Sequence, residues 1–289
     1  MLYPLKEILA LVETGGPDSG PCAAASLNIV DFDMVRALLG AAEELHSPVV
    51  IAIATRHWNR INANALVPAI RKLCTLSSVP VALHLDHSTE QERDIILSAL
   101  DLGFTSIMID GSKEEYDENV RITREITELA HARGISVEGE LGAMAGIEGV
   151  ADFAEPEKEK TPYTDPEAAA AFVKATGIDA LAVAVGTAHG LYKSEPEIQQ
   201  ELIGRIADTC PVPLVLHGAS GVPEKAIRTA VSRGIRKINY FSGFMVRAMN
   251  EVRRGADPDS NDYLAFRGRL MEAWKEEAKQ QIKLYRRDS

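Results

Sequence analysis

The chain has 289 residues, of which 46% are hydrophobic and 25% are charged, so it can bury a large core and lacks the composition of a disordered protein. Its formal net charge is -11, from 31 basic and 42 acidic residues. No positive excess is left to neutralise a phosphate backbone or an anionic membrane surface. We therefore expect neither nucleic acid nor a membrane as a partner.

The beginning of the chain and the cysteines are typical of a protein of the cytoplasm. Charged residues, Lys6 among them, interrupt the apolar N-terminal segment, and no apolar run of 18 residues occurs, so we expect neither a secretion signal nor a membrane span. The cysteines, Cys22, Cys74 and Cys210, are odd in number and widely spaced. This pattern favours buried thiols in a reducing compartment over a disulfide framework.

Eight short apolar runs rich in Val, Ile, Leu and Ala divide the chain, and each is followed by a longer segment with helical periodicity. The runs cover residues 22–28, 48–54, 79–85, 105–110, 135–141, 179–185, 212–217 and 235–240. Near-continuous apolar strands that alternate with helices indicate a parallel sheet covered on both faces. Eight such units in about 220 residues favour a closed (β/α)8 TIM barrel, an α/β fold, over an open sheet.

The predicted helices begin at Asp, Glu or Pro in several cases and end at Gly. They include residues 33–45, 90–103, 116–134, 165–177, 195–207 and 223–234. No low-complexity linker or internal repeat divides the sequence, so we expect a single domain over residues 1–289, with the barrel core at about 22–253. An amphipathic segment at 4–13 and a charged one at 261–286 predict an extra N-terminal helix and a C-terminal helical extension. These helices would cap the barrel or join subunits.

One connection, residues 142–164, is much longer than the two to six residues of an ordinary barrel loop. It has no apolar periodicity and contains three Gly and two Pro. It is either a solvated surface excursion or a lid, and long loops at the C-terminal face of a barrel favour the lid.

Three of the seven histidines, His87, His189 and His217, stand at the C-terminal ends of predicted strands. A lone histidine in such a place is more often a hydrogen-bonded structural residue. Three at matching ends of different strands point toward one axis when the barrel closes, and imidazole nitrogens suit Zn²⁺. The spacing therefore predicts a catalytic zinc with three protein ligands and one open position.

Carboxylates accompany these histidines. Asp86 directly precedes the first of them and can act as a general base or orient a ligand. Glu138 and Glu140 alternate on one strand and face the same side, where two like charges require a cation, protonation or a hydrogen-bond network. Asp110 ends the fourth run and lies near them by topology. Glu148, in the long connection, is the carboxylate that lid closure would bring to the metal.

Small and polar residues follow the last strands. Gly190 comes after the second histidine, and Gly218 and Ser220 come after the third. Glycine lets backbone N–H groups approach an anion, and the loops after strands seven and eight are a recurrent phosphate site in barrels. They can also be simple turn glycines. Asn239 and Ser242 would add side-chain donors on the same rim.

Six motifs, VALHLDHS, SIMIDGS, VEGELG, AVGTAHGLYK, LVLHGASG and KIN, occur in this order between about residues 5 and 250. In order and spacing they resemble the class II, metal-dependent fructose-bisphosphate and tagatose-bisphosphate aldolases. The GTAHGLYK motif and the short loops are more similar to the tagatose branch. The resemblance implies that the catalytic Zn²⁺ is held by His87, His189 and His217.

The resemblance also implies roles for the carboxylates. Asp86 corresponds to the acid/base that takes the proton from the hydroxyl next to the cleaved bond. Asp110 and Glu140 match an alternative or second divalent cation position. Glu148 matches the loop glutamate that moves a proton to or from the enediolate carbon, and Asn239 matches the residue that contacts the enediolate.

The substrate phosphate, by the same resemblance, is held at four positions: Gly190, Gly218, Ser220 and Ser242. Backbone groups near Ala188, Gly190 and Gly218 would hold a monovalent cation, Na⁺ or K⁺. The implied reaction is the reversible cleavage of a phosphorylated ketose into dihydroxyacetone phosphate and an aldehyde, through a zinc-stabilised enediolate. The enzyme would be a carbon-carbon lyase and a homodimer or homotetramer, with the helix at 261–286 as a surface for assembly.

Two segments depart from the family pattern. After the second run the chain reads IAIATRHWNR, which places Arg56 and His57 at the rim where the family has a serine or a small loop. Arg56 can clamp a phosphate or carboxylate with two hydrogen bonds, or pair with a surface acid. After the KIN motif the chain has Tyr240, Phe241 and Ser242, the last in place of a threonine, and the ring of Phe241 can narrow the substrate channel.

Three alternatives to a ketose-bisphosphate aldolase remain open at this point. The first is an aldolase of the same class acting on a keto-deoxy-sugar-acid phosphate, which Arg56 favours. The second is a non-catalytic barrel subunit that supports another aldolase. Retention of the three histidines with Asp86 and Glu148 argues against it, because a scaffold has no physical need for them. The third is a metal-dependent isomerase or epimerase that forms the same enediolate without cleaving the bond.

Overall fold

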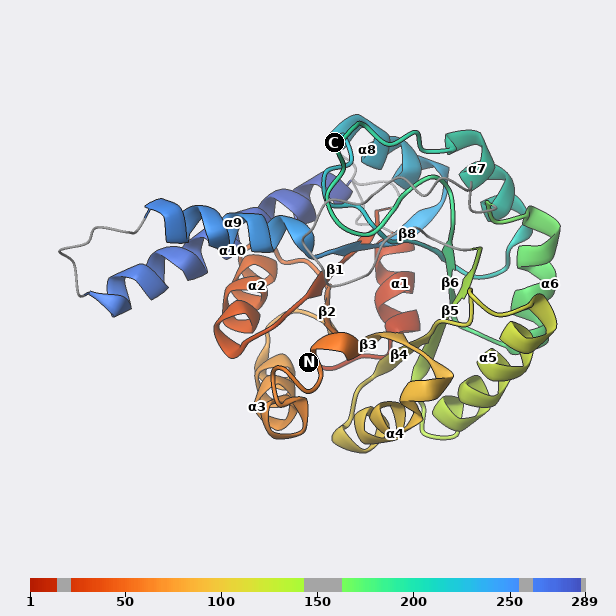
Figure 1. Cartoon of the computed structure of the whole chain (residues 1–289), viewed down its shortest axis with the longest axis horizontal. Helices are drawn as coiled ribbons and strands as arrows, with labels where there is room; N and C mark the ends of the chain where they lie inside the picture. The colour runs from red at the N-terminus through yellow and green to blue at the C-terminus, as the bar shows by residue number, and fades with distance from the viewer. Residues whose placement is uncertain (15–21, 143–162, 255–261, 287–289) are drawn as a thin grey trace.

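The computed structural model describes residues 1–14, 22–142, 163–254 and 262–286. Within these residues, eight parallel strands form one closed barrel in the order β1 to β8, and β8 pairs with β1 to complete the ring (Figure 1). The helices that follow the strands surround the ring. The predicted (β/α)8 fold is therefore confirmed.

The strands coincide with the eight apolar runs, and nearly every strand residue is buried. Their bounds are β1 Ala24–Asn28, β2 Val49–Ala54, β3 Val81–Ser88, β4 Ser106–Ile109, β5 Ser136–Leu141, β6 Ala180–Val183, β7 Leu214–Leu216 and β8 Ile235–Tyr240. Alternate residues face the outer helices and the barrel interior, as the pleat of a strand requires. Residues such as Leu83 and Leu85 pack outward, whereas Ala82 belongs to the interior cluster.

The helices of the outer layer are amphipathic, and several of their ends carry identifiable caps. They are α2 Phe32–Glu44, α3 Ala63–Leu76, α4 Arg93–Leu102, α5 Tyr116–His131, α6 Pro166–Thr176, α7 Gln200–Thr209, α8 Glu224–Arg233 and α9 Ser242–Arg254. The side chain of Asp31 accepts from the Met34 backbone N–H at 2.8 Å at the start of α2. Two short 3-10 turns, η1 Thr55–His57 and η2 Glu90–Glu92, follow β2 and β3.

Two helices differ from the expectation. α7 begins at Gln200 and not at 195, because the Gln199 backbone N–H donates to Val185 O at 2.9 Å and so belongs to the loop after β6. No predicted segment covers α3, which carries Pro68 in its interior. Proline lacks the N–H that an interior helical residue donates, so it weakens the helical pattern in the sequence.

The extra N-terminal helix, α1 Leu5–Thr14, closes one end of the barrel. In the view of Figure 1 it crosses the middle of the ring of strands. Its buried face, Leu5, Ile8, Leu9 and Val12, packs against the small interior residues near the strand beginnings. This end is therefore filled with apolar side chains, and the opposite end is left for polar residues. Of the two roles expected for this helix, the structure shows the cap.

The C-terminal helix, α10 Tyr263–Tyr285, packs along α2 and α9. Trp274 Nε1 donates to Phe244 O at 3.1 Å, and Tyr240 OH donates to Glu277 Oε1 at 2.5 Å, so α10 is fixed to the end of β8 and to the helix that follows it. α9 and the first half of α10 form a hairpin that projects beyond the barrel (Figure 1). Among the residues described, no helix combines the length and the apolar character that a membrane span requires.

The packing of α1 against the barrel interior predicts that its buried side chains stabilise the fold. Leu9 is 0% exposed against the barrel interior, so Leu9→Ala should lower the free energy of unfolding by about 2–5 kcal/mol through lost burial and a cavity. Leu11 lies on the same helix and is 46% exposed, so Leu11→Ala serves as the control. It should change the free energy of unfolding by no more than about 0.5 kcal/mol. Chemical denaturation of both variants measures the difference. Equal effects would show that α1 does not support the barrel.

Candidate active site

Three histidines meet at the C-terminal end of the barrel. His87 lies near the end of β3, His189 lies in the loop after β6, and His217 directly follows β7. One ring nitrogen of each lies within 4.8 Å of the others. The ring centroid of His87 lies 4.8 Å from that of His189 and 4.6 Å from that of His217. The structure therefore brings together the three residues that the sequence placed at separate strand ends.

The backbone at His87 explains how two consecutive residues reach the same site. In a regular strand Asp86 and His87 would point to opposite faces. His87 instead has a left-handed φ of 49°, and the pairing of β3 with β4 shifts register between Leu85 and Ser88. Such a conformation costs about 1–3 kcal/mol in a residue other than glycine, and it persists where surrounding contacts hold it. The bulge turns the His87 side chain back toward the barrel axis.

His217 is held by a buried carboxylate. Its Nε2 lies 2.8 Å from Glu138 Oε1, and its Nδ1 lies 2.8 Å from His87 Nε2. Burial lowers the pKa of His217 well below its usual range, so the ring is neutral and has a lone pair for a ligand. A carboxylate that accepts from one ring nitrogen leaves the other nitrogen to face a metal, the usual arrangement of histidine ligands.

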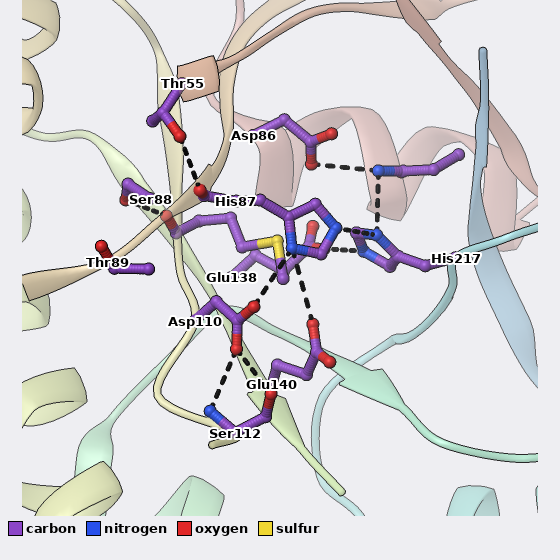
Figure 2. A network of polar contacts seen from close by, with 12 residues as sticks. Thr55, Asp86, His87, Ser88, Thr89, Asp110, Ser112, Glu138, Glu140 and His217 are labelled. Atoms are coloured by element: carbon purple, nitrogen blue, oxygen red, sulfur yellow. Dashed lines mark hydrogen bonds and ion pairs between the residues drawn. The ribbon is translucent and has the colours of Figure 1, made fainter. Parts of the chain in front are cut away.

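Acidic side chains surround the other side of His87 (Figure 2). Its Nδ1 lies 3.3 Å from Asp110 Oδ2 and 3.9 Å from Glu140 Oε2. Burial alone lowers the pKa of His87, but the charge of Asp86 and the hydrogen bond to Asp110 outweigh it and hold that pKa well above its usual range. Burial and the nearby Asp110 hold the pKa of Glu140 well above its usual range. The negative charges of Asp86 and Asp110 therefore favour a positive charge at His87.

The donor chemistry fits metal ions. Three imidazoles that converge suit a tetrahedral Zn²⁺ with an open position. A second group, His87 with Asp110 and Glu140, also has ligand atoms within 4.8 Å of one another. Glu140 Oε2 is buried and accepts no hydrogen bond from the described residues. A buried carboxylate oxygen of this kind suits a divalent cation, because the ion replaces the missing donor.

Asp86 is fully buried next to these groups. Asn28 Nδ2 donates to its Oδ2 at 2.7 Å, and Asn239 Nδ2 donates to its Oδ1 at 3.0 Å. Burial raises the pKa of Asp86, but His87, Lys237 and the hydrogen bond from Asn28 contribute together to outweigh it and leave the pKa below its ordinary value. The carboxylate is therefore ionised and can accept a proton.

Sequence reasoning missed three buried residues around the site: Asn28, His84 and Lys237. Asn28 ends the first strand. It could have been found by the criterion that found the histidines, which is a polar residue at the end of a strand. His84 and Lys237 lie inside apolar runs, and only strand alternation, which places them on the inner face, could have indicated them.

The predicted phosphate residues line one pocket beside the histidines. Its lining consists of Gly190, Gly218, Ala219, Ser220, Asn239, Phe241 and Ser242. Ser242 begins the 13-residue helix α9, so the positive end of that helix adjoins the pocket. Backbone N–H groups at a helix start and in a glycine loop are a recurrent anion site.

Gly218 has a positive φ of 67° where the chain passes close to another backbone segment. A Cβ atom at this position would lie 2.3 Å from Ala188 O, so only glycine fits. The Tyr192 hydroxyl lies 2.9 Å from Ala188 O and 2.7 Å from Gly218 O, and it accepts from the Ala188 N–H. One hydroxyl hydrogen can satisfy only one of these two carbonyls at a time.

The residues that depart from the family pattern form part of the rim. Thr55 Oγ1, in the turn after β2, donates to His87 O at 2.9 Å. The His57 ring lies 5.2 Å from that of Phe241, so a contact joins the turn after β2 to the pocket lined by the predicted phosphate residues. Arg56 lies in the same turn and is not among the residues that line the pocket. Glu148 and residues 143–162 of the predicted lid lie outside the described residues.

Comparison with known proteins identifies the family of the chain. The sequence matches the family model described as Fructose-bisphosphate aldolase class-II over residues 17–288. It is 38% identical over 266 residues to the protein YdjI of Escherichia coli (strain K12), with 92% of each chain covered. It is also 38% identical over 285 residues to the fructose-bisphosphate aldolase of Thermus caldophilus, covering 90% of this chain and 92% of that one. The fold superposes on the crystal structure of the YdjI aldolase from Escherichia coli K12 with a TM-score of 0.85 and 34% identity, covering 99% and 97% of the two chains.

Because the backbone of Ala188 lies so close to Gly218, we expect position 218 to tolerate no side chain. Gly218→Ala should lower the free energy of unfolding by more than about 2 kcal/mol, since it adds a backbone clash to an unfavourable φ. It should also weaken the binding of inorganic phosphate. Gly268→Ala on α10 is the control, because its Cβ meets no atom within 4 Å. Thermal unfolding and phosphate titration compare the two variants, and a Gly218→Ala protein as stable as the control would contradict the prediction.

Proposed function

The chain belongs to the class II fructose-bisphosphate aldolase family, and on this basis we propose that it reversibly cleaves a phosphorylated ketose into dihydroxyacetone phosphate and an aldehyde. The substrate is of the fructose- or tagatose-bisphosphate kind. The observation that carries this proposal is the convergence of three histidines, one ionised aspartate and a pocket lined by the predicted phosphate residues at one end of the barrel.

His87, His189 and His217 would hold one catalytic Zn²⁺ per chain, with Asp110 and Glu140 as ligands of an alternative or second divalent cation. When bound, Zn²⁺ supplies Lewis-acid chemistry, which polarises the ketose carbonyl and stabilises the negative charge left by cleavage. The neutral His217 ring is prepared for this role by its contact with Glu138.

Asp86 acts as the general base. It takes the proton from the hydroxyl next to the carbon-carbon bond that breaks, and it returns the proton in the direction of synthesis. Its two amide donors, Asn28 and Asn239, fix the carboxylate in place. Asn239 also lines the pocket, and by the resemblance it would contact the enediolate, with the N–H that faces His217 Nδ1 as the donor once that nitrogen holds the metal. Glu148, which the resemblance assigns to proton transfer at the enediolate carbon, would complete the set.

The phosphate lies at Gly190, Gly218, Ser220 and Ser242, where the loops meet the start of α9. The carbonyl that Tyr192 leaves without its hydrogen, Ala188 O or Gly218 O, supports a monovalent cation next to this pocket. Na⁺ or K⁺ there would offset the phosphate charge.

A sugar-acid phosphate is the second candidate substrate. The turn after β2 reaches the phosphate pocket through the contact of His57 with Phe241, and it carries Arg56 at the rim. A guanidinium binds a carboxylate with two parallel hydrogen bonds. Arg56 therefore favours a substrate whose aldehyde product, and not the dihydroxyacetone phosphate, carries an acid group.

The assembly we propose is a homodimer or homotetramer formed through the α9–α10 hairpin. Large apolar side chains are exposed along its outer half: Met249, Val252, Tyr263 and Leu264. The hairpin projects from the barrel, so a second copy of the chain can cover these side chains without obstructing the site (Figure 1).

Metal analysis and product analysis test the reaction together. We expect about one zinc per chain, and release of dihydroxyacetone phosphate from fructose or tagatose bisphosphate that stops on chelation. Asp86→Asn should keep the zinc and lose at least about 100-fold in rate, because the base is gone. His217→Ala should lose the zinc, whereas His131→Ala on α5 serves as the matched control and should retain it.

Each of the other outcomes supports one of the alternative functions. Zinc with cleavage of a sugar-acid phosphate alone would select the second substrate. An isomer without cleavage would indicate an isomerase or epimerase. Absence of zinc together with no cleavage of any of these sugars would leave only the non-catalytic subunit.

The assembly is tested separately by mass measurement in solution. Leu264→Glu should convert the oligomer to a smaller species, because it places a charge in the apolar contact. Leu76→Glu on α3 is the control, since Leu76 is 67% exposed and Leu264 is 71% exposed. A monomeric unmodified protein would contradict the proposal, as would equal effects of the two substitutions.

A further inference from the structure

Lys237 is a buried residue that the reaction above does not use. It lies on β8 inside the barrel and is 0% exposed. Its Nζ lies 2.8 Å from Glu138 Oε2 and 2.7 Å from Asn239 Oδ1. A buried ammonium group is costly unless it is paired with acceptor atoms, so Glu138 and Asn239 must each present an oxygen to Nζ.

The contact with Asn239 determines how that amide is oriented. An ammonium group only donates, so the atom of Asn239 that faces Lys237 must be the oxygen. The amide NH₂ is then directed to Asp86 Oδ1 at 3.0 Å and His217 Nδ1 at 3.2 Å. With the amide reversed, its oxygen would face the Asp86 carboxylate and no hydrogen bond would form.

The contact with Glu138 determines where the proton of His217 lies. Lys237 pairs with Oε2, which leaves Oε1 to face His217 Nε2 and to accept its hydrogen. The His217 proton is therefore on Nε2. Its Nδ1 has a lone pair directed toward His87 Nε2, 2.8 Å away, where the metal ligands converge.

We propose that Lys237 is a positioning residue that sets both the tautomer of His217 and the orientation of the Asn239 amide. It is not among the residues that line the pocket or form the two candidate metal groups, and it acts through Glu138 and Asn239. This inference deepens the proposed function and rests on it for the identity of the metal site. The two contacts themselves are a property of the metal-free protein.

The test compares the unmodified protein with Lys237→Met, which keeps the length of the side chain and removes its donors. Nitrogen-15 NMR of histidine-labelled, metal-free protein should show His217 protonated on Nε2 in the unmodified chain and a mixture of tautomers in the variant. The zinc dissociation constant, measured by competition with a chelator, should rise about 10- to 100-fold, the usual effect of removing a group that orients a ligand.

A second variant addresses folding. Lys237→Met leaves the Glu138 carboxylate buried without its cation, which can prevent folding. Lys237→Met combined with Glu138→Gln removes both charges, but nothing then decides whether the oxygen or the nitrogen of the introduced amide faces His217. This double variant should fold and still show mixed tautomers and weaker zinc binding. Ile206→Ala on α7, a buried change outside the site, is the control for lost stability and should leave both readouts unchanged.

The results distinguish a failure of this inference from a failure of the proposed function. If the double variant retains the Nε2 tautomer and the zinc affinity of the unmodified protein, Lys237 only neutralises Glu138 and the inference is overturned. If the unmodified protein binds no zinc, the proposed function fails, and the tautomer measurement alone decides the role of Lys237.

Discussion

The closure of eight parallel strands into a barrel is the constraint on which the site depends. It directs alternate side chains of every strand to one axis and separates the two ends of the interior. α1 and small apolar residues fill one end, so the polar residues gather at the other. His87, His189 and His217 come from distant parts of the sequence, and only closure brings their ring nitrogens within 4.8 Å of one another.

Polar groups buried at that end satisfy one another in a connected set. Lys237 pairs with Glu138, Glu138 accepts from His217, and Asn239 joins Lys237 to Asp86. Each group limits which atom its neighbour can present, so the orientation of the site residues is fixed before any ligand binds. The strained backbone of His87 is tolerated within this set, and it directs two consecutive side chains to one place.

The residues at the rim of the barrel differ from those of the interior in the part of the site that they line. The turn after β2 and the segment after β8 carry Arg56, His57 and Phe241, and the last two are in contact beside the phosphate pocket. None of the three belongs to the group of histidines whose ring nitrogens converge. Under the proposed function, substrate choice would therefore depend on the rim and the reaction class on the interior.

The sequence by itself determined the fold, because eight apolar runs alternating with helical periodicity have few arrangements other than a closed barrel. It also identified the histidines and Asp86, since polar residues at strand ends are visible without coordinates. Only the tertiary structure revealed the contacts of Lys237 and the left-handed backbone of His87, and only it decided between the two roles expected for the N-terminal helix. These features depend on which side chains face one another across the barrel and on one irregular residue in β3, and neither has a local signal in the sequence.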